Sequence, residues 1–202
     1  LTGFRSMIGN GKNALGDLER YAGRYRDAED RYKDALRLFE AIGSGKRHTV
    51  RLNMAMNALG RGSLPRAREL AQALVDELPA VDPRAVVCHG VLCAVCAHDE
   101  AWPEYDGHWK IFQPLKHENV EADIPLVFEM IGDHARARGD NERAAEAYDD
   151  ALELWQSLKR DDRVANVRKA LGRIGTVPHM KRRKPPKSAA PKERTRATTT
   201  NE

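Results

Sequence analysis

The stretch ALGDLERYAGRYRDAEDRYKDALRLFE, residues 14–40, returns 116 residues later in altered form as MIGDHARARGDNERAAEAYDDALEL, residues 130–154. Small and aromatic residues occupy the same places in both stretches. The matched pairs are Leu15 and Ile131, Gly16 and Gly132, Gly23 and Gly139, Ala28 and Ala144, Tyr32 and Tyr148, Ala35 and Ala151, and Leu36 and Leu152. Matches at one fixed spacing over this many positions indicate an internal repeat.

Two further copies fit between these stretches. Residues 52–79 (LNMAMNALGRGSLPRARELAQALVDELP) form one copy, and residues 91–115 (VLCAVCAHDEAWPEYDGHWKIFQPL) form a looser one. The anchor positions are Ala28, Ala67, Tyr105 and Ala144, at steps of 39, 38 and 39 residues. We therefore predict four repeats with this period. Their expected boundaries are about 5–43, 47–80, 82–117 and 123–160.

The second half of the first repeat has the pattern of an amphipathic helix. Apolar residues recur at steps of three and four along residues 25–39 and form one stripe, opposite a face of alternating charges. The glycines predicted to end helices are Gly43, Gly62 and Gly139. The pairs predicted to begin helices, as N-cap and first turn, are Asp82-Pro83 and Asp123-x-Pro125. One helical hairpin cannot bury its stripe alone, so neighbouring repeats must stack.

The unit resembles the tetratricopeptide repeat (TPR), a helical hairpin with L-G, then A-x-x-x-aromatic and a closing proline. The residues that carry the resemblance are Gly16, Ala28, Tyr32, Pro79, Gly132, Ala144 and Tyr148. The departures are Glu19, Ala58, Cys96 and Ala135, where an aromatic is expected after L-G, and Tyr105 in place of the small alanine. The resemblance implies an all-α fold: a right-handed α-solenoid of four TPR-like helical hairpins in residues 1–160, a capping helix in 161–175 and a disordered basic tail in 176–202.

Units of this length resemble TPR arrays appended to bacterial signalling proteins, including Ser/Thr kinases. The resemblance implies a protein–protein interaction module that holds a peptide or a partner helix in its concave groove. The chain begins with Leu1 and shows no secretory signal. We therefore expect the C-terminal regulatory part of a larger cytoplasmic protein, with no catalytic site and no cofactor in this chain. The alternative is a fragment of a Ser/Thr protein kinase whose catalytic domain lies N-terminal to it.

In arrays of this family the first helix of each hairpin forms the concave surface. The implied groove begins at Asn13, Asp17 and Arg20, and the predicted partner-binding residues are Asn53, Met56, Asn57, Gly90, Val91, Ala94, Glu129, Asp133 and Arg136. The middle of this surface is apolar or small, which favours a wide apolar contact with a peptide. Only Asn13 and Asn53 would fit the carboxylate clamp of the chaperone-binding members. The alternative is that the apolar residues pack under neighbouring helices.

All three cysteines lie in VVCHGVLCAVCAHDEAW, residues 86–102, two of them as C-x-x-C. A zinc site needs four ligands, usually a second pair elsewhere, and no second pair is evident. The repeat register puts Cys93 where Gly16 and Gly132 stand, and Cys96 where an alanine stands. Free cysteine behaves as a small buried hydrophobe, so we expect packing in the core and a metal or redox site only as the alternative.

Two short strings partly resemble a phosphate-binding loop: GNGKN at 9–13 and GSGKR at 43–47. A P-loop needs G-x-x-x-x-G-K-[S/T] between a strand and a helix, and neither string has this spacing. Gly43 and Gly45 are expected in the turn between two repeats. His134, Glu129 and Asp133 share a predicted helix, but no nucleophile, base and orienting group can be placed together. We expect solvated charges there.

The positive charge of the chain is concentrated at its C-terminus. Residues 178–202 carry eight Lys or Arg against two Glu, whereas residues 1–177 carry 26 basic and 28 acidic residues. The tail has too few apolar residues to fold. It is an alternative contact for nucleic acid or an acidic surface, although it has no aromatic residue for base stacking. The longest apolar run, residues 85–97, is shorter than the roughly 20 residues of a membrane span, so no membrane partner is expected.

Overall fold

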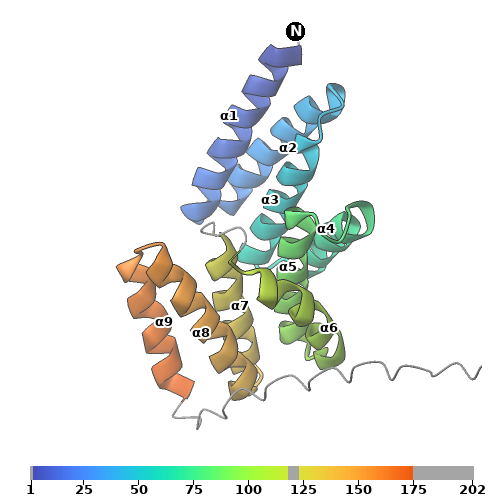
Figure 1. Cartoon of the computed structure of the whole chain (residues 1–202). Coiled ribbons are helices and arrows are strands. Elements are labelled where there is room, and N and C mark those ends of the chain that lie inside the picture. The colour runs from blue at the N-terminus through green and yellow to red at the C-terminus, as the bar shows by residue number, and fades with distance from the viewer. Residues whose placement is uncertain (1, 118–122, 175–202) are drawn as a thin grey trace, which may run out of the picture.

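The computed structural model describes residues 2–117 and 123–174. These residues form nine α-helices and one short 3₁₀ helix, with no strand among them (Figure 1). The elements are α1 (Thr2–Tyr21), α2 (Tyr25–Ala41), α3 (Lys46–Gly60), α4 (Leu64–Glu77), α5 (Pro83–Asp99), α6 (Trp102–Phe112), the 3₁₀ helix η1 (Gln113–Leu115), α7 (Asp123–Ala137), α8 (Asn141–Ser157) and α9 (Asp161–Ile174). The prediction of an all-α fold is confirmed.

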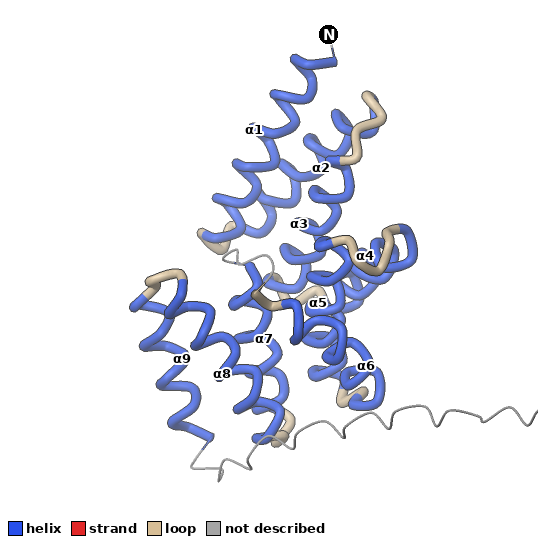
Figure 2. Tube along the Cα trace, viewed as in Figure 1, coloured by secondary structure: helices blue, strands red, loops and turns tan. Residues whose placement is uncertain are grey.

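Consecutive helices pair into four hairpins, and the hairpins stack (Figure 2). The pairs are α1 with α2, α3 with α4, α5 with α6, and α7 with α8, and each packs on the next. Helix α9 packs on α8 and ends the stack, as expected of a capping helix. The fold is therefore an α-solenoid of TPR-like hairpins. The predicted basic tail lies outside the described residues.

Short turns join the helices, and glycine makes several of them possible. Gly43, Gly62 and Gly139 have φ angles of 62°, 79° and 81°, in the left-handed region that glycine adopts without a steric penalty. The prediction that these glycines end helices is confirmed. The string GSGKR spans the turn between α2 and α3, and GNGKN lies inside α1. Neither string follows a strand.

The two predicted helix starts differ. Asp82 caps α5 as expected, because its Oδ1 accepts a hydrogen bond of 2.9 Å from the backbone N–H of Arg84. Asp123 lies within α7 rather than before it, so the prediction of an N-cap at Asp123 was wrong. Its carboxylate is held by residues of α1 instead.

The matched glycine and tyrosine of the first and last repeats make the same close contact. A Cβ at Gly16 would lie 2.5 Å from the ring of Tyr32, and one at Gly132 would lie 2.7 Å from the ring of Tyr148. Both rings are fully buried. The first and last repeats therefore need glycine at this place, because the aromatic ring of the second helix occupies the space of a side chain.

The cysteines lie in the core. Cys88, Cys93 and Cys96 on α5 are completely buried, so the prediction that they occupy packing positions is confirmed. Burial raises the pKa of the Cys88 thiol to about 12 and raises the pKa of the other two thiols as well. Within residues 2–117 and 123–174, no group of three or more His, Cys, Asp or Glu side chains could hold a metal ion. No helix in these ranges is long and apolar enough to cross a membrane.

Candidate partner-binding surface

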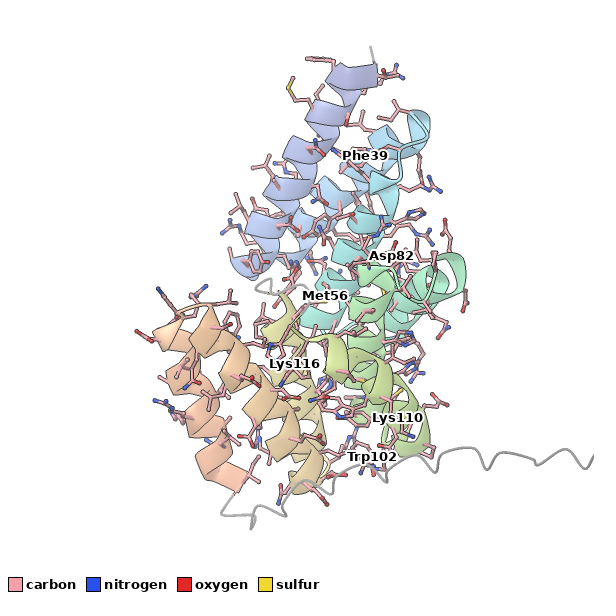
Figure 3. All side chains as sticks on the ribbon, in the orientation of Figure 1. Phe39, Met56, Asp82, Trp102, Lys110 and Lys116 are labelled. Atoms are coloured by element: carbon pink, nitrogen blue, oxygen red, sulfur yellow. The ribbon has the colours of Figure 1, made fainter. Side chains whose placement is uncertain are left out.

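The middle of the predicted groove is buried. Met56 is 4 % exposed, and Val91 and Ala94 are not exposed at all (Figure 3 labels Met56). A Cβ at Gly90 would lie 2.7 Å from the ring of Phe112, so this glycine faces α6 within its own hairpin. Helix α5 packs directly on both α3 and α7. These four residues offer no open surface, and the alternative interpretation, packing under neighbouring helices, describes them.

The two predicted asparagines join elements within the chain. Asn53 donates a hydrogen bond of 3.0 Å to Oδ1 of Asn13 on α1. Asn57 donates one of 3.0 Å to the backbone carbonyl of Tyr25 on α2. Both asparagines are buried. Their amides therefore hold the second hairpin against the first, and a role in binding a partner stays a prediction.

Glu129 and His134, both on α7, contact different parts of the structure. The Glu129 carboxylate accepts hydrogen bonds from Nε1 of Trp155 and, at 2.8 Å, from Nη2 of Arg163. Burial raises its pKa, although Arg163 opposes the shift. His134 Nδ1 lies 2.7 Å from the backbone carbonyl oxygen of Ala94. The expectation of solvated charge was wrong for Glu129, because α8 and α9 cover it and it anchors the cap.

Asp133 and Arg136 are the predicted groove residues that remain open. Their side chains are 58 % and 37 % exposed. The hydroxyl of Tyr148 donates a hydrogen bond of 2.5 Å to Oδ1 of Asp133. Arg136 Nη2 lies 3.9 Å from the same oxygen, and the hydroxyl of Tyr148 raises the pKa of this arginine. We call Asp133, Arg136 and Tyr148 the fourth triad.

The first repeat holds the same three residue types 116 residues earlier. Tyr32 donates a hydrogen bond of 2.8 Å to Oδ1 of Asp17, and Arg20 Nε donates one of 3.2 Å to the Tyr32 hydroxyl. We call Asp17, Arg20 and Tyr32 the first triad. The spacing of the two triads is visible in the sequence. The repeat of glycines, alanines and tyrosines alone does not indicate the triads, because charged residues on a helix face are usually solvated.

The two triads differ in what their arginine binds. Arg20 Nη2 donates to both carboxylate oxygens of Asp123, at 2.8 and 2.9 Å, and the Tyr21 hydroxyl donates to Asp123 Oδ1 at 2.8 Å. The Arg20 side chain is 5 % exposed. Burial alone lowers its pKa, but Asp123 and Tyr32 reverse the shift, and the pKa rises. In Arg136, by contrast, Nε is buried and has no hydrogen-bond partner in the described structure.

The third repeat carries a pair of histidines instead of a triad. Nδ1 of His89 on α5 lies 2.9 Å from Nδ1 of His108 on α6, and the ring centroids are 5.1 Å apart. Burial lowers the pKa of both rings, and His108 lowers that of His89 further. An N–H···N hydrogen bond needs one donor and one acceptor, so at least one of the two rings is neutral when it forms.

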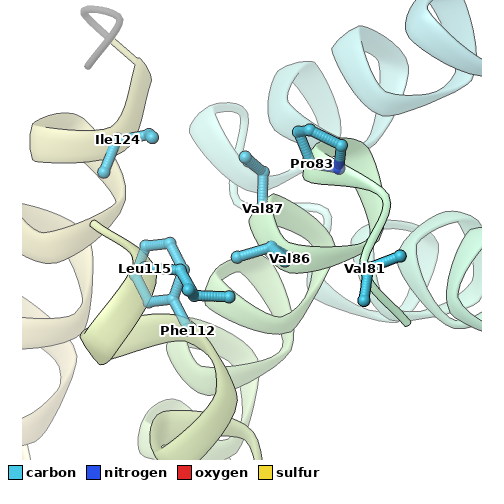
Figure 4. A pocket seen from close by; sticks show the side chains of 7 residues that line it. All are labelled: Val81, Pro83, Val86, Val87, Phe112, Leu115 and Ile124. Atoms are coloured by element: carbon cyan, nitrogen blue, oxygen red, sulfur yellow. The ribbon is translucent and has the colours of Figure 1, made fainter. Parts of the chain in front are cut away.

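A small apolar cavity lies where α5 begins, beside η1 and the start of α7 (Figure 4). Its volume is about 30 Å³, and its lining residues are Val81, Pro83, Val86, Val87, Phe112, Leu115 and Ile124. A space of this size holds about one water molecule, which the apolar walls would not bind. The cavity is a packing defect between hairpins rather than a ligand site.

The comparisons with known proteins agree with this architecture. A model of the tetratricopeptide repeat matches residues 13–82 and 129–175, more than half of the chain. A search of curated protein sequences found no match. Among solved structures, the chain is similar to BtubC (BKLC) from P. vanneervenii, with 18 % sequence identity and a TM-score of 0.58 over 84 % of this chain and 72 % of that one. At this identity the likeness shows the fold alone. The chain belongs to the tetratricopeptide repeat family, whose repeats form scaffolds for protein–protein interaction.

Proposed function

We propose that this chain is a protein–protein interaction module that binds its partner at the fourth triad. In this proposal Arg136 receives an acidic side chain from the first turn of a partner helix. The observation that carries it is the first triad, where Arg20 holds Asp123 in the first described turn of α7 through two hydrogen bonds. The same constellation, exposed in the fourth repeat, is therefore suited to the same ligand from another molecule.

The chemistry of the two residue types favours this pairing. A guanidinium presents its N–H groups as a planar fork that matches the two oxygens of a carboxylate. An acidic residue in the first turn also interacts favourably with the dipole of its own helix, so such residues are frequent there. Asp133 and Tyr148 restrict the Arg136 side chain before a partner arrives. Less side-chain entropy is then lost on binding.

The test is a binding measurement with a library of helical peptides that carry acidic or amide residues in the first turn. Peptides selected on the chain are labelled and titrated by fluorescence anisotropy. We expect Arg136→Ala to weaken binding by about 10-fold to 100-fold, the range for loss of a charge-assisted hydrogen bond. Arg31→Ala, an exposed arginine on α2, is the matched control and should leave the affinity unchanged.

The peptide provides the second arm of the test. Replacing its first-turn Asp by Asn should have the same effect as Arg136→Ala, and combining both changes should cost little more than either alone. Selected peptides without acidic first turns, or unchanged binding by Arg136→Ala, would contradict the proposal.

The narrower expectations about function belong to the same proposal. In this proposal the chain is the regulatory part of a larger, cytoplasmic bacterial signalling protein, a class that includes Ser/Thr kinases. The length of the repeat unit supports this role. The presence of kinase H-R-D and D-F-G motifs upstream in the same gene decides that point.

Nucleic-acid binding through residues 178–202 is the second candidate, supported by their positive charge. It predicts a salt-dependent affinity that disappears on truncation at residue 177.

A further inference from the structure

Helix α1 has an apolar face that no described element covers. Phe4, Met7, Leu15 and Leu18 are exposed by 62, 62, 46 and 63 %. With 3.6 residues per turn, these four side chains lie on one side of the helix, with Gly11 at the centre of that side. We call these five residues the outer stripe. Figure 1 shows α1 at one end of the stack of hairpins.

The opposite side of α1 is the one that packs on its own hairpin. Gly9 and Gly16 are buried there, and Cβ atoms added to them would meet the rings of Phe39 and Tyr32 on α2. The helix thus contacts α2 through glycines and keeps its large apolar side chains on the outside. Apolar side chains gathered on one exposed helix face mark an interaction site.

The later repeats show what this face does elsewhere in the molecule. The positions equivalent to Gly11 hold Val50, Cys88 and Val127, and those equivalent to Leu15 hold Met54, Leu92 and Ile131. All six side chains are buried. The first helix of each later hairpin packs on the hairpin before it. The positions of Gly11 and Leu15 therefore lie, in each later hairpin, on a face that packs against another helix.

The order of residues along the outer stripe indicates the partner. Phe4, Met7, Gly11, Leu15 and Leu18 follow at steps of 3, 4, 4 and 3, so the stripe reads alike in both directions from Gly11. A two-fold axis through Gly11 would place Phe4 against Leu18 of a second copy and Met7 against Leu15. A Cβ at Gly11 would meet nothing within 4 Å in this chain. Contacts within the chain therefore give no reason for glycine there, whereas close approach of a second helix does.

The charges beside the outer stripe are compatible with the same arrangement. Around this axis, Arg5 of one copy would lie on the same flank as Glu19 of the other, within about half a helical turn. Lys12 of one copy would lie close to Lys12 of the other copy, near the axis. Its Nζ lies 2.5 Å from Asp34 Oδ2 within the chain, which neutralises that charge.

We infer that the outer stripe is the contact surface for a second copy of this chain, with the two α1 helices antiparallel about a two-fold axis at Gly11. Such a contact is isologous, since the same residues serve on both sides. One helix from each chain gives a contact smaller than the standard interface, so the dimer should be weak, with a dissociation constant on the order of 10 μM.

Sedimentation equilibrium of the whole chain over a range of concentrations tests the inference. We expect a monomer–dimer equilibrium, and Leu18→Glu should abolish the dimer because two buried carboxylates would face apolar side chains. Ile111→Glu on α6, also an exposed apolar residue, is the matched control and should dimerise like the parent. Circular dichroism checks that both variants fold. A parent chain that stays monomeric at about 500 μM overturns the inference, as does a dimer that Leu18→Glu leaves intact.

A disulfide then tests the two-fold axis itself. Gly11→Cys should form a covalent dimer under mild oxidation, because the axis brings the two residues to within disulfide reach. Gly107→Cys, another exposed helical glycine with no neighbour within 4 Å, is the control and should remain monomeric. The three native cysteines are buried and do not compete. Equal cross-linking of both variants, or none at Gly11→Cys, contradicts the antiparallel register.

Discussion

The first and fourth repeats carry the same residues and use them differently. In the first repeat, Arg20 is buried against Asp123 while the outer face of α1 is open. In the fourth repeat, α5 covers the equivalent face of α7, and Arg136 is open instead. The hairpins themselves match, down to the contact between glycine and tyrosine. Position in the stack therefore decides which groups hold the fold together and which are free to bind a partner.

The largest effect is expected from substitutions at the core positions that the two repeats share. Ala28 and Ala144 are both fully buried at the approach of two helices. Ala28→Trp and Ala144→Trp should each lower the free energy of unfolding by about 3 kcal/mol or more, because the core has no room for an indole. Urea unfolding measures the change. Ala165→Trp on the exposed side of α9 is the control, with an expected change of about 0.5 kcal/mol or less. A neutral Ala144→Trp would refute the repeat register.

The difference between the two repeats predicts different losses of stability when Arg20 and Arg136 are replaced. Arg20→Ala removes one partner of a largely buried ion pair, and we expect it to lower the free energy of unfolding by about 2–3 kcal/mol. Arg136→Ala removes a partly exposed side chain and should change it by about 0.5 kcal/mol or less. Urea unfolding of both variants provides the numbers.

A double-mutant cycle assigns the larger effect to its partner. If Asp123 is the reason for it, Asp123→Ala should add little in the background of Arg20→Ala. Equal losses for Arg20→Ala and Arg136→Ala would show that the two triads do the same structural work, and the contrast between the repeats would disappear.

The sequence was sufficient for the fold because the repeat is made by local contacts. Gly16 and Tyr32 meet across a single turn, so their spacing returns in the fourth copy as Gly132 and Tyr148 and can be recognised without a structure. The same register placed Cys93 and Cys96 in the core correctly. Helix ends at glycines with positive φ are local features of the same kind.

The groove could not be predicted in the same way. Whether Val91 and Ala94 are exposed depends on how closely α3, α5 and α7 stack, and this is a property of the whole superhelix. The contact between Arg20 and Asp123 joins residues 103 positions apart. Glu129 reads as an exposed charge until α9 is placed over it. Contacts between non-neighbouring hairpins have no period, so repeat analysis does not find them.

The third repeat has a pair of histidines where the end repeats have triads, and this pair gives the smallest expected effect. Buried His89 and half-buried His108 face each other, with Glu104 and Arg68 the charged groups that act on His108. The pKa of each histidine is lowered in the folded state, so the unfolded chain binds more protons once the pH falls below the ordinary histidine value of about 6.5. The contribution of the pair to stability is therefore present above that pH and is lost as the pH falls through the lowered values.

Urea unfolding between pH 8 and pH 5 measures this dependence, with His89→Gln/His108→Gln as the matched variant. An amide pair can still form a hydrogen bond but does not titrate in this range, so the variant should lose less stability on acidification than the parent chain. The direction is the informative part. A parent chain that gains stability relative to the variant as the pH falls would mean that a neighbouring carboxylate stabilises the protonated histidine. Glu104 is the carboxylate that acts on His108. The third repeat would then contain a charged site like those of the end repeats, rather than a neutral contact in the core.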